Sequence, residues 1–297
     1  MKKQHRTHKR LFLLTICIMV VSLLLPGCGG EAAVEEEAII EEVSEEAVTT
    51  EEEESIVEQE GEVTTEEELV EEEEVTEEEE GVIFPDSNLE ATIREVIDKP
   101  KGTIYTSDLA GISWFPARKK GITNLKGLEQ CTNLTSLTLE ENAIYDISPL
   151  ADLTDLTSLD ISKNEIWDIS PLANLTNLTR LSLDRNALED ISPLANLTNL
   201  TYLDLTRNEI WDISPLANLT NLDELIIPNN HIIDISALAS LTKLTWLWAW
   251  NNQINDISPI VNLPNLRKLW IVLGNPVNDL SRNTLVPQLE ARGVVVE

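Results

Sequence analysis

The sequence predicts an α/β repeat fold, a curved solenoid of stacked repeat units closed at each end by a short helical cap. Two observations carry this prediction. An Asn recurs every 22 residues, six times in succession, at Asn142, Asn164, Asn186, Asn208, Asn230 and Asn252. The same pattern of Leu and Ile precedes each Asn, as at Leu134, Leu137 and Leu139. A unit this short cannot bury its apolar side alone, so successive copies must stack and share one core.

The frame of each unit reads L-x-x-L-x-L-x-x-N and continues x-I-x-D-I-S-P-L. A fixed period of roughly 20–29 residues with this spacing is the signature of the leucine-rich repeat. We therefore predict leucine-rich repeats over residues 121–278, with a degenerate first copy at residues 121–128. The folded part of the chain is long enough to bury a sizeable core.

Both ends of the array carry segments suited to cover it, because terminal repeats need a polar outer face. An N-terminal cap is predicted over residues 81–120. Its first helix should begin at Asp86 or Ser87 as N-cap, and a second short helix should begin near Ser107. Four residues of the first helix share its apolar face: Leu89, Ile93, Val96 and Ile97. One extra residue at Gly274-Asn275-Pro276 breaks the period, and a C-terminal cap is predicted over residues 279–297, with a short helix over 285–291 and an edge strand over 294–296.

The chain begins with a basic segment followed by an apolar run over residues 11–25. This run is short for a membrane span and suits a signal sequence. The residues Leu25-Pro26-Gly27-Cys28 resemble a bacterial lipobox, although Pro26 departs from the usual residue type. The resemblance implies a signal peptide over residues 1–27, acylation of Cys28, for example by palmitate, and an extracytoplasmic, membrane-anchored lipoprotein. An ordinary signal peptide and an uncleaved anchor are the alternatives.

Residues 28–80 are predicted to be a disordered acidic linker. Positions 31–80 hold 26 Glu and no Lys or Arg. Such a segment cannot bury enough apolar surface to offset its ordering entropy, and its like charges extend it. A solvated spacer is the favoured interpretation, and weak calcium binding is the alternative. Positions 81–297 are also acidic, with 27 Asp or Glu against 16 Lys or Arg, which argues against a nucleic-acid partner.

The cap, the segment Gly121-Ile122-Thr123-Asn124-Leu125 and the repeated Asp-Ile-Ser-Pro-Leu together resemble the internalin-like class of bacterial surface leucine-rich repeat proteins. The resemblance covers residues 83–297. It implies one strand per repeat in a parallel sheet on the concave side, 3₁₀ turns on the convex side, and a protein partner. The recurring Asn would satisfy buried backbone groups. A second column of residues would cap the turns: Asp146, Asp168, Asp190, Asp212, Asp234 and Asp256.

The residues between the inward Leu and Ile columns should face solvent on the concave side, because side chains alternate along a strand. On this side the aromatic residues gather toward the C-terminal end, at Tyr202, Trp246, Trp248, Trp250 and Trp270, with Ile226 nearby. Exposed aromatic patches tend to mark interaction sites. Arg180, Arg185 and Arg207 would orient a ligand held there. Mutual packing of the Trp side chains under the cap is the alternative.

Three interpretations of this surface stay open. The resemblance favours a protein ligand, the flat Trp faces would also suit a glycan, and a purely structural role needs no ligand. A further aromatic column lies beyond the sheet edge, made of Tyr145, Trp167 and Trp211. It would either extend a binding rim or cover the loops.

Signals for catalysis are missing from the sequence. We find no phosphate-binding loop, zinc spacing or nucleophile elbow, and His231 stands without a recognisable partner. Cys131 is expected to be a small buried residue. We therefore predict a non-enzymatic binding protein that needs no cofactor and no metal.

Overall fold

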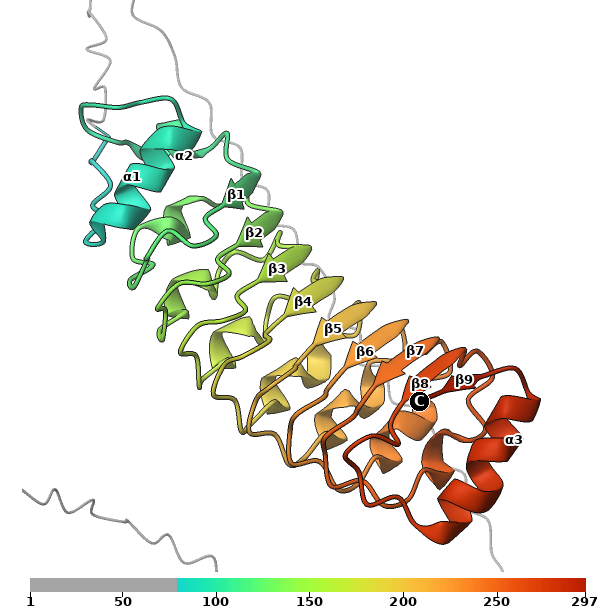
Figure 1. Cartoon of the computed structure of the whole chain (residues 1–297). Coiled ribbons are helices and arrows are strands. Elements are labelled where there is room, and N and C mark those ends of the chain that lie inside the picture. Colours follow the sequence, from blue (N-terminus) through green and yellow to red (C-terminus); the bar gives the residue numbers. More distant parts are fainter. Residues whose placement is uncertain (1–78) are drawn as a thin grey trace, which may run out of the picture. The chain divides into compact units, whose positions relative to one another are not determined.

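The computed structural model describes residues 79–297, so the predicted signal peptide, Cys28 and the acidic linker up to residue 78 lie outside the described residues. Within them, nine strands form one parallel sheet in sequence order. Figure 1 shows the strands side by side along the solenoid, with the turns on the opposite side. The strands are β1 (Trp114–Pro116), β2 (Ser136–Thr138), β3 (Ser158–Asp160), β4 (Arg180–Ser182), β5 (Tyr202–Asp204), β6 (Glu224–Ile226), β7 (Trp246–Trp248), β8 (Lys268–Trp270) and β9 (Val295–Val296).

Short 3₁₀ turns form the side opposite the sheet, as predicted. They are η1 (Leu128–Gln130), η2 (Ser148–Leu150), η3 (Ser170–Leu172), η4 (Ser192–Asn196), η5 (Ser214–Asn218), η6 (Ser236–Ser240) and η7 (Ser258–Ile260). Before η3, Asp168 Oδ1 accepts a hydrogen bond of 2.8 Å from the backbone N–H of Ser170, and the other repeats carry the same contact. These Asp side chains therefore cap the turns, which confirms the prediction.

The middle residue of each repeat strand faces the core. Leu137, Leu159 and Leu203 are at most 1% exposed, whereas the residues on either side of each are partly exposed. Because each repeat strand pairs with its equivalent 22 residues later, the inward residues stack into one continuous core. We call the opposite, solvent-facing side of the strands the sheet face.

The recurring Asn forms a ladder through the core, as predicted. Asn208 Nδ2 donates to the carbonyl oxygens of Leu183 at 3.1 Å and Leu205 at 3.0 Å. Its Oδ1 accepts from the backbone N–H of Leu188 at 3.1 Å. One side chain thus bonds backbone groups of two neighbouring repeats, which need partners because they are buried. The carbonyls of Leu183 and Leu205 each accept from a second ladder Asn as well, Asn186 and Asn230.

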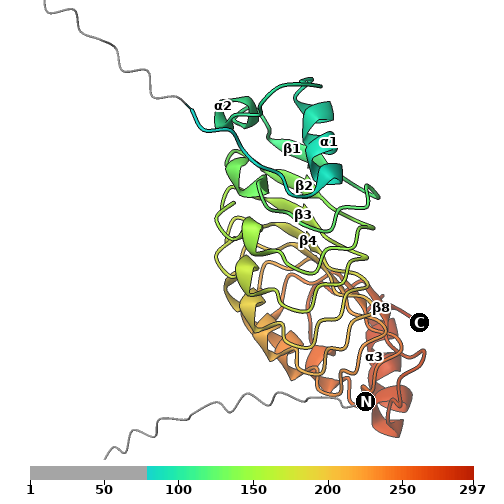
Figure 2. The same ribbon diagram turned by 90° about the vertical axis from the view of Figure 1, so that its left-hand side faces the viewer.

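The N-terminal cap contains α1 (Ser87–Val96) and α2 (Thr106–Leu109) (Figure 2). Asp86 is the N-cap of α1, and its Oδ1 accepts from the backbone N–H groups of Asn88 and Leu89. Its Oδ2 accepts from Thr123 N at 2.7 Å and so ties the helix to the first turn. Val96, expected on the apolar face, is 38% exposed, whereas Ile97 packs against the core.

Strand β1 was not predicted. It lies within the residues assigned to the N-terminal cap and pairs with β2, Phe115 opposite Leu137. Phe115 is fully buried and takes the inward position that Leu holds elsewhere. The sheet therefore begins before residue 121, with a strand that lies 22 residues, one repeat, ahead of β2.

The C-terminal cap follows the extra residue of the last repeat. Asn275 still joins the ladder, but it donates to the carbonyl four residues before it instead of three. Gly274 allows this, with φ +70° and with Asn251 Oδ1 only 1.8 Å from where a Cβ would lie. A π-helical turn, η8 (Ser281–Leu285), then leads into α3 (Val286–Ala291), and β9 closes the sheet. The helix and edge strand match the prediction.

Candidate binding surface

Four tryptophans meet on the sheet face at the C-terminal end of the array. Trp246 and Trp248 lie two residues apart on β7 and so point to the same side, and Trp250 follows the strand. Trp270 on β8 is the register partner of Trp248. The ring centroid of Trp248 lies 6.4 Å from that of Trp246, 6.1 Å from that of Trp250 and 5.0 Å from that of Trp270. We call these four residues the tryptophan cluster.

The cluster is neither fully exposed nor fully buried. All four side chains are half-buried against one another. Trp270 Nε1 donates to Glu297 Oε2 at 2.6 Å, so this ring also supports the C-terminal cap. Trp248 Nε1 is buried and has no acceptor among the described residues. An unpaired buried donor costs about 1–3 kcal/mol.

A hollow of about 310 Å³ opens at the cluster, lined by Trp248, Trp250, Trp270 and Leu273. Leu273 is 69% exposed at its rim. The lining is made of apolar side chains, which suits a hydrophobic group of a ligand.

Ile226 does not contribute an exposed surface, contrary to the expectation that its column faces solvent. It is 7% exposed because its register partner on β7 is Trp248, whose ring lies beside it. Ile226 therefore forms part of the support under the cluster.

Two cations lie over aromatic rings of the sheet face. Arg180 Cζ lies 4.2 Å from the ring centroid of Tyr202, so two of the predicted site residues are in contact. Lys268 Nζ lies 4.5 Å from the ring of Trp246 and 5.7 Å from that of Trp270. Sequence analysis did not single out Lys268, although it stands beside Trp246 in the same column and its register could have revealed it. Both contacts have the geometry of cation–π interactions.

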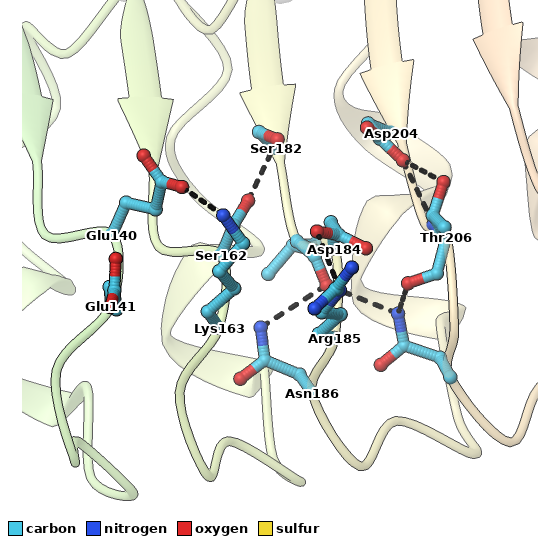
Figure 3. A network of polar contacts seen from close by, with 12 residues as sticks. Glu140, Glu141, Ser162, Lys163, Ser182, Asp184, Arg185, Asn186, Asp204 and Thr206 are labelled. Carbon is cyan, nitrogen blue, oxygen red and sulfur yellow. Dashed lines mark hydrogen bonds and ion pairs between the residues drawn. The ribbon is translucent and has the colours of Figure 1, made fainter.

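Arg185 and Arg207 lie beyond the ends of β4 and β5, where the backbone adopts the left-handed conformation with φ +53° at each. They line a second hollow of about 370 Å³ together with Asp184, Asp204 and the rings of Trp248 and Trp250. Arg185 Nε lies 3.6 Å from Asp184 Oδ2 (Figure 3). The structure thus brings the predicted Arg185 and Arg207 to the edge of the tryptophan cluster, whereas Arg180 and Tyr202 lie apart from it, across β6.

Toward the N-terminal end the sheet face is mainly polar, apart from the exposed Trp114 on β1. Lys163 forms an ion pair with Glu140, and Ser162 Oγ lies 2.8 Å from Ser182 Oγ (Figure 3). Arg118 also pairs with Glu140, with Nε 3.0 Å from Oε2. Because these charges already have partners, the aromatic end of the face is the better candidate for an unsatisfied surface.

The carboxyls of Asp184 and Asp204 have raised pKa values. Burial is the main cause for both, and their mutual repulsion adds to it for Asp184. Burial also raises the pKa of Tyr202 to about 12. The second hollow therefore contains carboxylates that are costly to ionise.

Replacing Asp204 with Asn is expected to stabilise the fold at pH 7. Because the pKa of Asp204 is raised in the folded protein, the free energy of unfolding falls as the pH rises through that pKa. Asn does not ionise, so the variant avoids this loss of stability, and its side-chain oxygen can still accept from Thr206 N. The gain should disappear as pH falls below the ordinary value of 3.8. Thermal unfolding from pH 3 to pH 8 would measure it.

Asp256→Asn is the matched control with the opposite sign. The backbone N–H of Ser258 lowers the pKa of Asp256, so this variant should lose stability at pH 7 and match the wild type in acid. Parallel pH dependence in the two variants would contradict the assignment.

The described residues hold no group of three His, Cys, Asp or Glu side chains placed to bind a metal ion. Cys131 is buried as expected, and burial raises the pKa of its thiol to about 12, so it is a poor nucleophile. Within residues 79–297, no helix is both long and apolar enough to cross a membrane.

Comparison with known proteins agrees with this architecture. A family model described as leucine-rich repeats in two copies matches residues 132–174, 176–218 and 242–285. The fold and its ladder thus define a leucine-rich repeat protein. The crystal structure of internalin C2 from Listeria monocytogenes is 38% identical, with a TM-score of 0.66, over 72% of this chain and 92% of that one. An internalin, InlF, from the same organism is 35% identical, with a TM-score of 0.61, over 75% of this chain and 72% of the other. The chain belongs to the internalin family.

A leucine-rich repeat protein of Leptospira interrogans shares the fold at 22% identity, with a TM-score of 0.50, over 59% of this chain and 51% of that one. No curated protein sequence matches the chain.

Proposed function

We propose that this protein is a non-enzymatic binding protein of the bacterial cell surface, and that the tryptophan cluster anchors a protein partner on the sheet face. The observation that carries the proposal is the apolar hollow of about 310 Å³ among half-buried indole rings. Membership of the internalin family supports it, because proteins of this type act through protein–protein interaction.

The shape of the hollow favours an apolar side chain of a protein over a sugar ring. Trp248 and Trp270 meet edge to face at 82°, so the rings form a notch and not a flat platform. A compact hydrophobic side chain fills such a notch. Glycan binding by the cluster remains the alternative that the same experiment tests.

The surrounding charges would orient the partner. Lys268 and Arg180 lie over ring faces, and Arg185 and Arg207 border the second hollow. Such rim charges contribute more to orientation and association rate than to affinity. The partner surface would carry an apolar centre with polar groups around it.

Changing Trp246 and Trp250 together to Ala is expected to weaken binding of the partner at least thirty-fold, about 2 kcal/mol, because buried aromatic anchors dominate interface energies. The full chain would be immobilised and offered first a protein extract and then wall glycans. Trp114→Ala is the matched control, since Trp114 is 60% exposed on the same sheet face at its other end.

A protein retained by the wild type and the control, and lost from the double variant, supports the proposal. Retention of glycan alone, with the same loss, supports the alternative. Equal capture by all three proteins places binding elsewhere and leaves the tryptophan cluster an architectural role.

We also propose that Cys28 carries a lipid that anchors the chain. The support is the lipobox-like Leu25-Pro26-Gly27-Cys28 after an apolar run. Cys28→Ala is expected to abolish incorporation of labelled palmitate and to shift the protein out of the membrane fraction. Labelling at wild-type level would contradict the assignment.

A further inference from the structure

A row of exposed side chains runs along the flank of the solenoid, away from the sheet face. Its members follow the 22-residue period: Tyr145, Trp167, Glu189 and Trp211. We call them the flank row. In the second repeat the row residue lies seven positions after the end of β2 and three before η2. The exposed fractions of Tyr145, Trp167 and Trp211 are 60%, 65% and 55%, so these rings are directed to solvent and do not cover the loops.

Backbone hydrogen bonds between repeats fix the spacing of the flank row along the solenoid. The backbone carbonyl just before each row residue accepts from the next repeat: Glu165 N to Ile144 O, Ala187 N to Ile166 O and Glu209 N to Leu188 O, each at 2.9 Å. Neighbouring row residues are therefore spaced like hydrogen-bonded strands, about 4.8 Å apart, and Trp167 lies roughly 10 Å from Trp211. The buried Ile and Leu that precede them hold this backbone in the core.

Trp211 is held in a defined orientation. His231 of the next repeat stacks on it, with ring centroids 4.7 Å apart and planes 28° apart. Glu209 Oε2 lies 2.6 Å from His231 Nε2 and fixes that ring in turn. With one face of the indole covered by His231, the exposure of Trp211 leaves its other face to a ligand. A side chain ordered before binding loses less entropy when it binds.

Trp167 borders an open hollow of about 600 Å³. Ile169, Ala187 and Pro193 supply apolar walls, and Asp168, Glu189 and Asp190 supply carboxylates. An aromatic face next to several hydrogen-bond acceptors suits a ligand with apolar C–H faces and many hydroxyl donors. A pyranose ring has this combination.

We propose that the flank row binds a linear, neutral β-1,4-linked glycan lying along the solenoid axis. An extended β-1,4 chain advances by nearly one repeat spacing per ring, and each ring is turned over relative to the last. Alternate rings therefore present the same face, which matches Trp167 and Trp211 two repeats apart. Glu189, between them, would accept from a hydroxyl of the intervening ring, and Tyr145 would border the next ring.

Charge and regularity decide between possible ligands. Positions 81–297 have 27 acidic against 16 basic residues, and three of the acidic residues line the hollow beside Trp167, so an acidic polysaccharide would be repelled. Tyr145, Trp167 and Trp211 lie whole numbers of repeats apart, so a polymer whose rise matches the repeat spacing contacts all three rings at once. This site is distinct from the tryptophan cluster, so the two proposals can fail independently.

The test is calorimetric titration of the full chain with cellohexaose, chitohexaose and maltohexaose. At least one of the two β-1,4 hexasaccharides should bind, and maltohexaose, whose α-1,4 linkages curve the chain, should not. The corresponding trisaccharide should bind more weakly, because it cannot span from Tyr145 to Trp211. Trp167→Ala combined with Trp211→Ala should reduce affinity at least ten-fold. Trp114→Ala, on the sheet face and outside both candidate sites, should leave it unchanged.

Circular dichroism would establish that the variants fold, as expected for exposed positions. Failure of both β-1,4 hexasaccharides to bind overturns the proposal. So does equal binding of maltohexaose, or binding lost in Trp246→Ala but kept in the flank double variant, which would move the glycan to the tryptophan cluster. A protein whose capture depends on Trp167 and Trp211, without glycan binding, would make the flank row a protein-binding surface instead.

Discussion

Replacing Asn208 with Ala is expected to lower the free energy of unfolding by roughly 3–5 kcal/mol. The Asn208 side chain is 4% exposed and satisfies the carbonyls of Leu183 and Leu205 and the N–H of Leu188. Alanine would leave the N–H of Leu188 buried without a partner, at about 1–3 kcal/mol. It would also remove one of the two hydrogen bonds of each carbonyl, at about 0.5–1.5 kcal/mol each, while Asn186 still donates to Leu183 O and Asn230 to Leu205 O. Denaturant unfolding followed by circular dichroism would measure the loss.

Asn199→Ala is the matched control. Asn199 also donates to a backbone carbonyl of the preceding repeat, Thr176 O at 2.9 Å, but the contact is exposed to water. Its loss should cost less than about 1 kcal/mol, since water can replace the bond. If both variants lost the same free energy of unfolding, burial of the Asn208 contacts would not explain their contribution to stability.

Phe115→Ala is expected to cost roughly 3–5 kcal/mol, the range for removal of a buried aromatic ring from a core. Phe115 is fully buried in β1 and is the largest of the fully buried side chains in the described chain. The loss should fall on the N-terminal cap, because contacts in a solenoid are local. Hydrogen exchange would detect faster exchange around α1 and β2 and little change near β8.

The neighbouring Trp114→Ala provides the comparison. Trp114 lies on the same strand but is 60% exposed, and its removal should change stability by less than about 1 kcal/mol. A larger effect at Trp114 than at Phe115 would mean that the inward and outward positions of β1 have been assigned the wrong way round.

Most of the fold could be predicted from the 22-residue period, because every repeat carries Leu or Ile at the same inward positions. The first strand was missed for a specific reason. Its inward positions hold Phe115 and Ala117 instead of Leu, and Lys120 stands where the ladder has Asn. The backbone there is still satisfied, because Asn142 Oδ1 accepts from Lys120 N and Ile122 N. Asn142 of the following repeat thus supplies the hydrogen-bond acceptor for this backbone. The residue pattern of a single repeat cannot reveal a contact made by the next one.

The position of the tryptophan cluster was also predictable, because register arithmetic alone places Trp248 beside Trp270. How far the rings are buried was not, since it depends on side-chain rotamers and on contacts with the cap, such as Trp270 with Glu297. For the same reason the burial of Ile226 and the hollow beside Leu273 emerge only from the packed structure.

The Asn ladder and the inward Leu and Ile residues hold the backbone without drawing on any outward side chain. The distance between equivalent positions on the solenoid surface is therefore a whole number of repeat spacings. Gain or loss of one 22-residue unit would shift everything beyond it by one strand spacing, about 4.8 Å, and leave each local contact as it was. In such a protein the reach between two binding surfaces can be altered in fixed steps while the surfaces themselves stay the same.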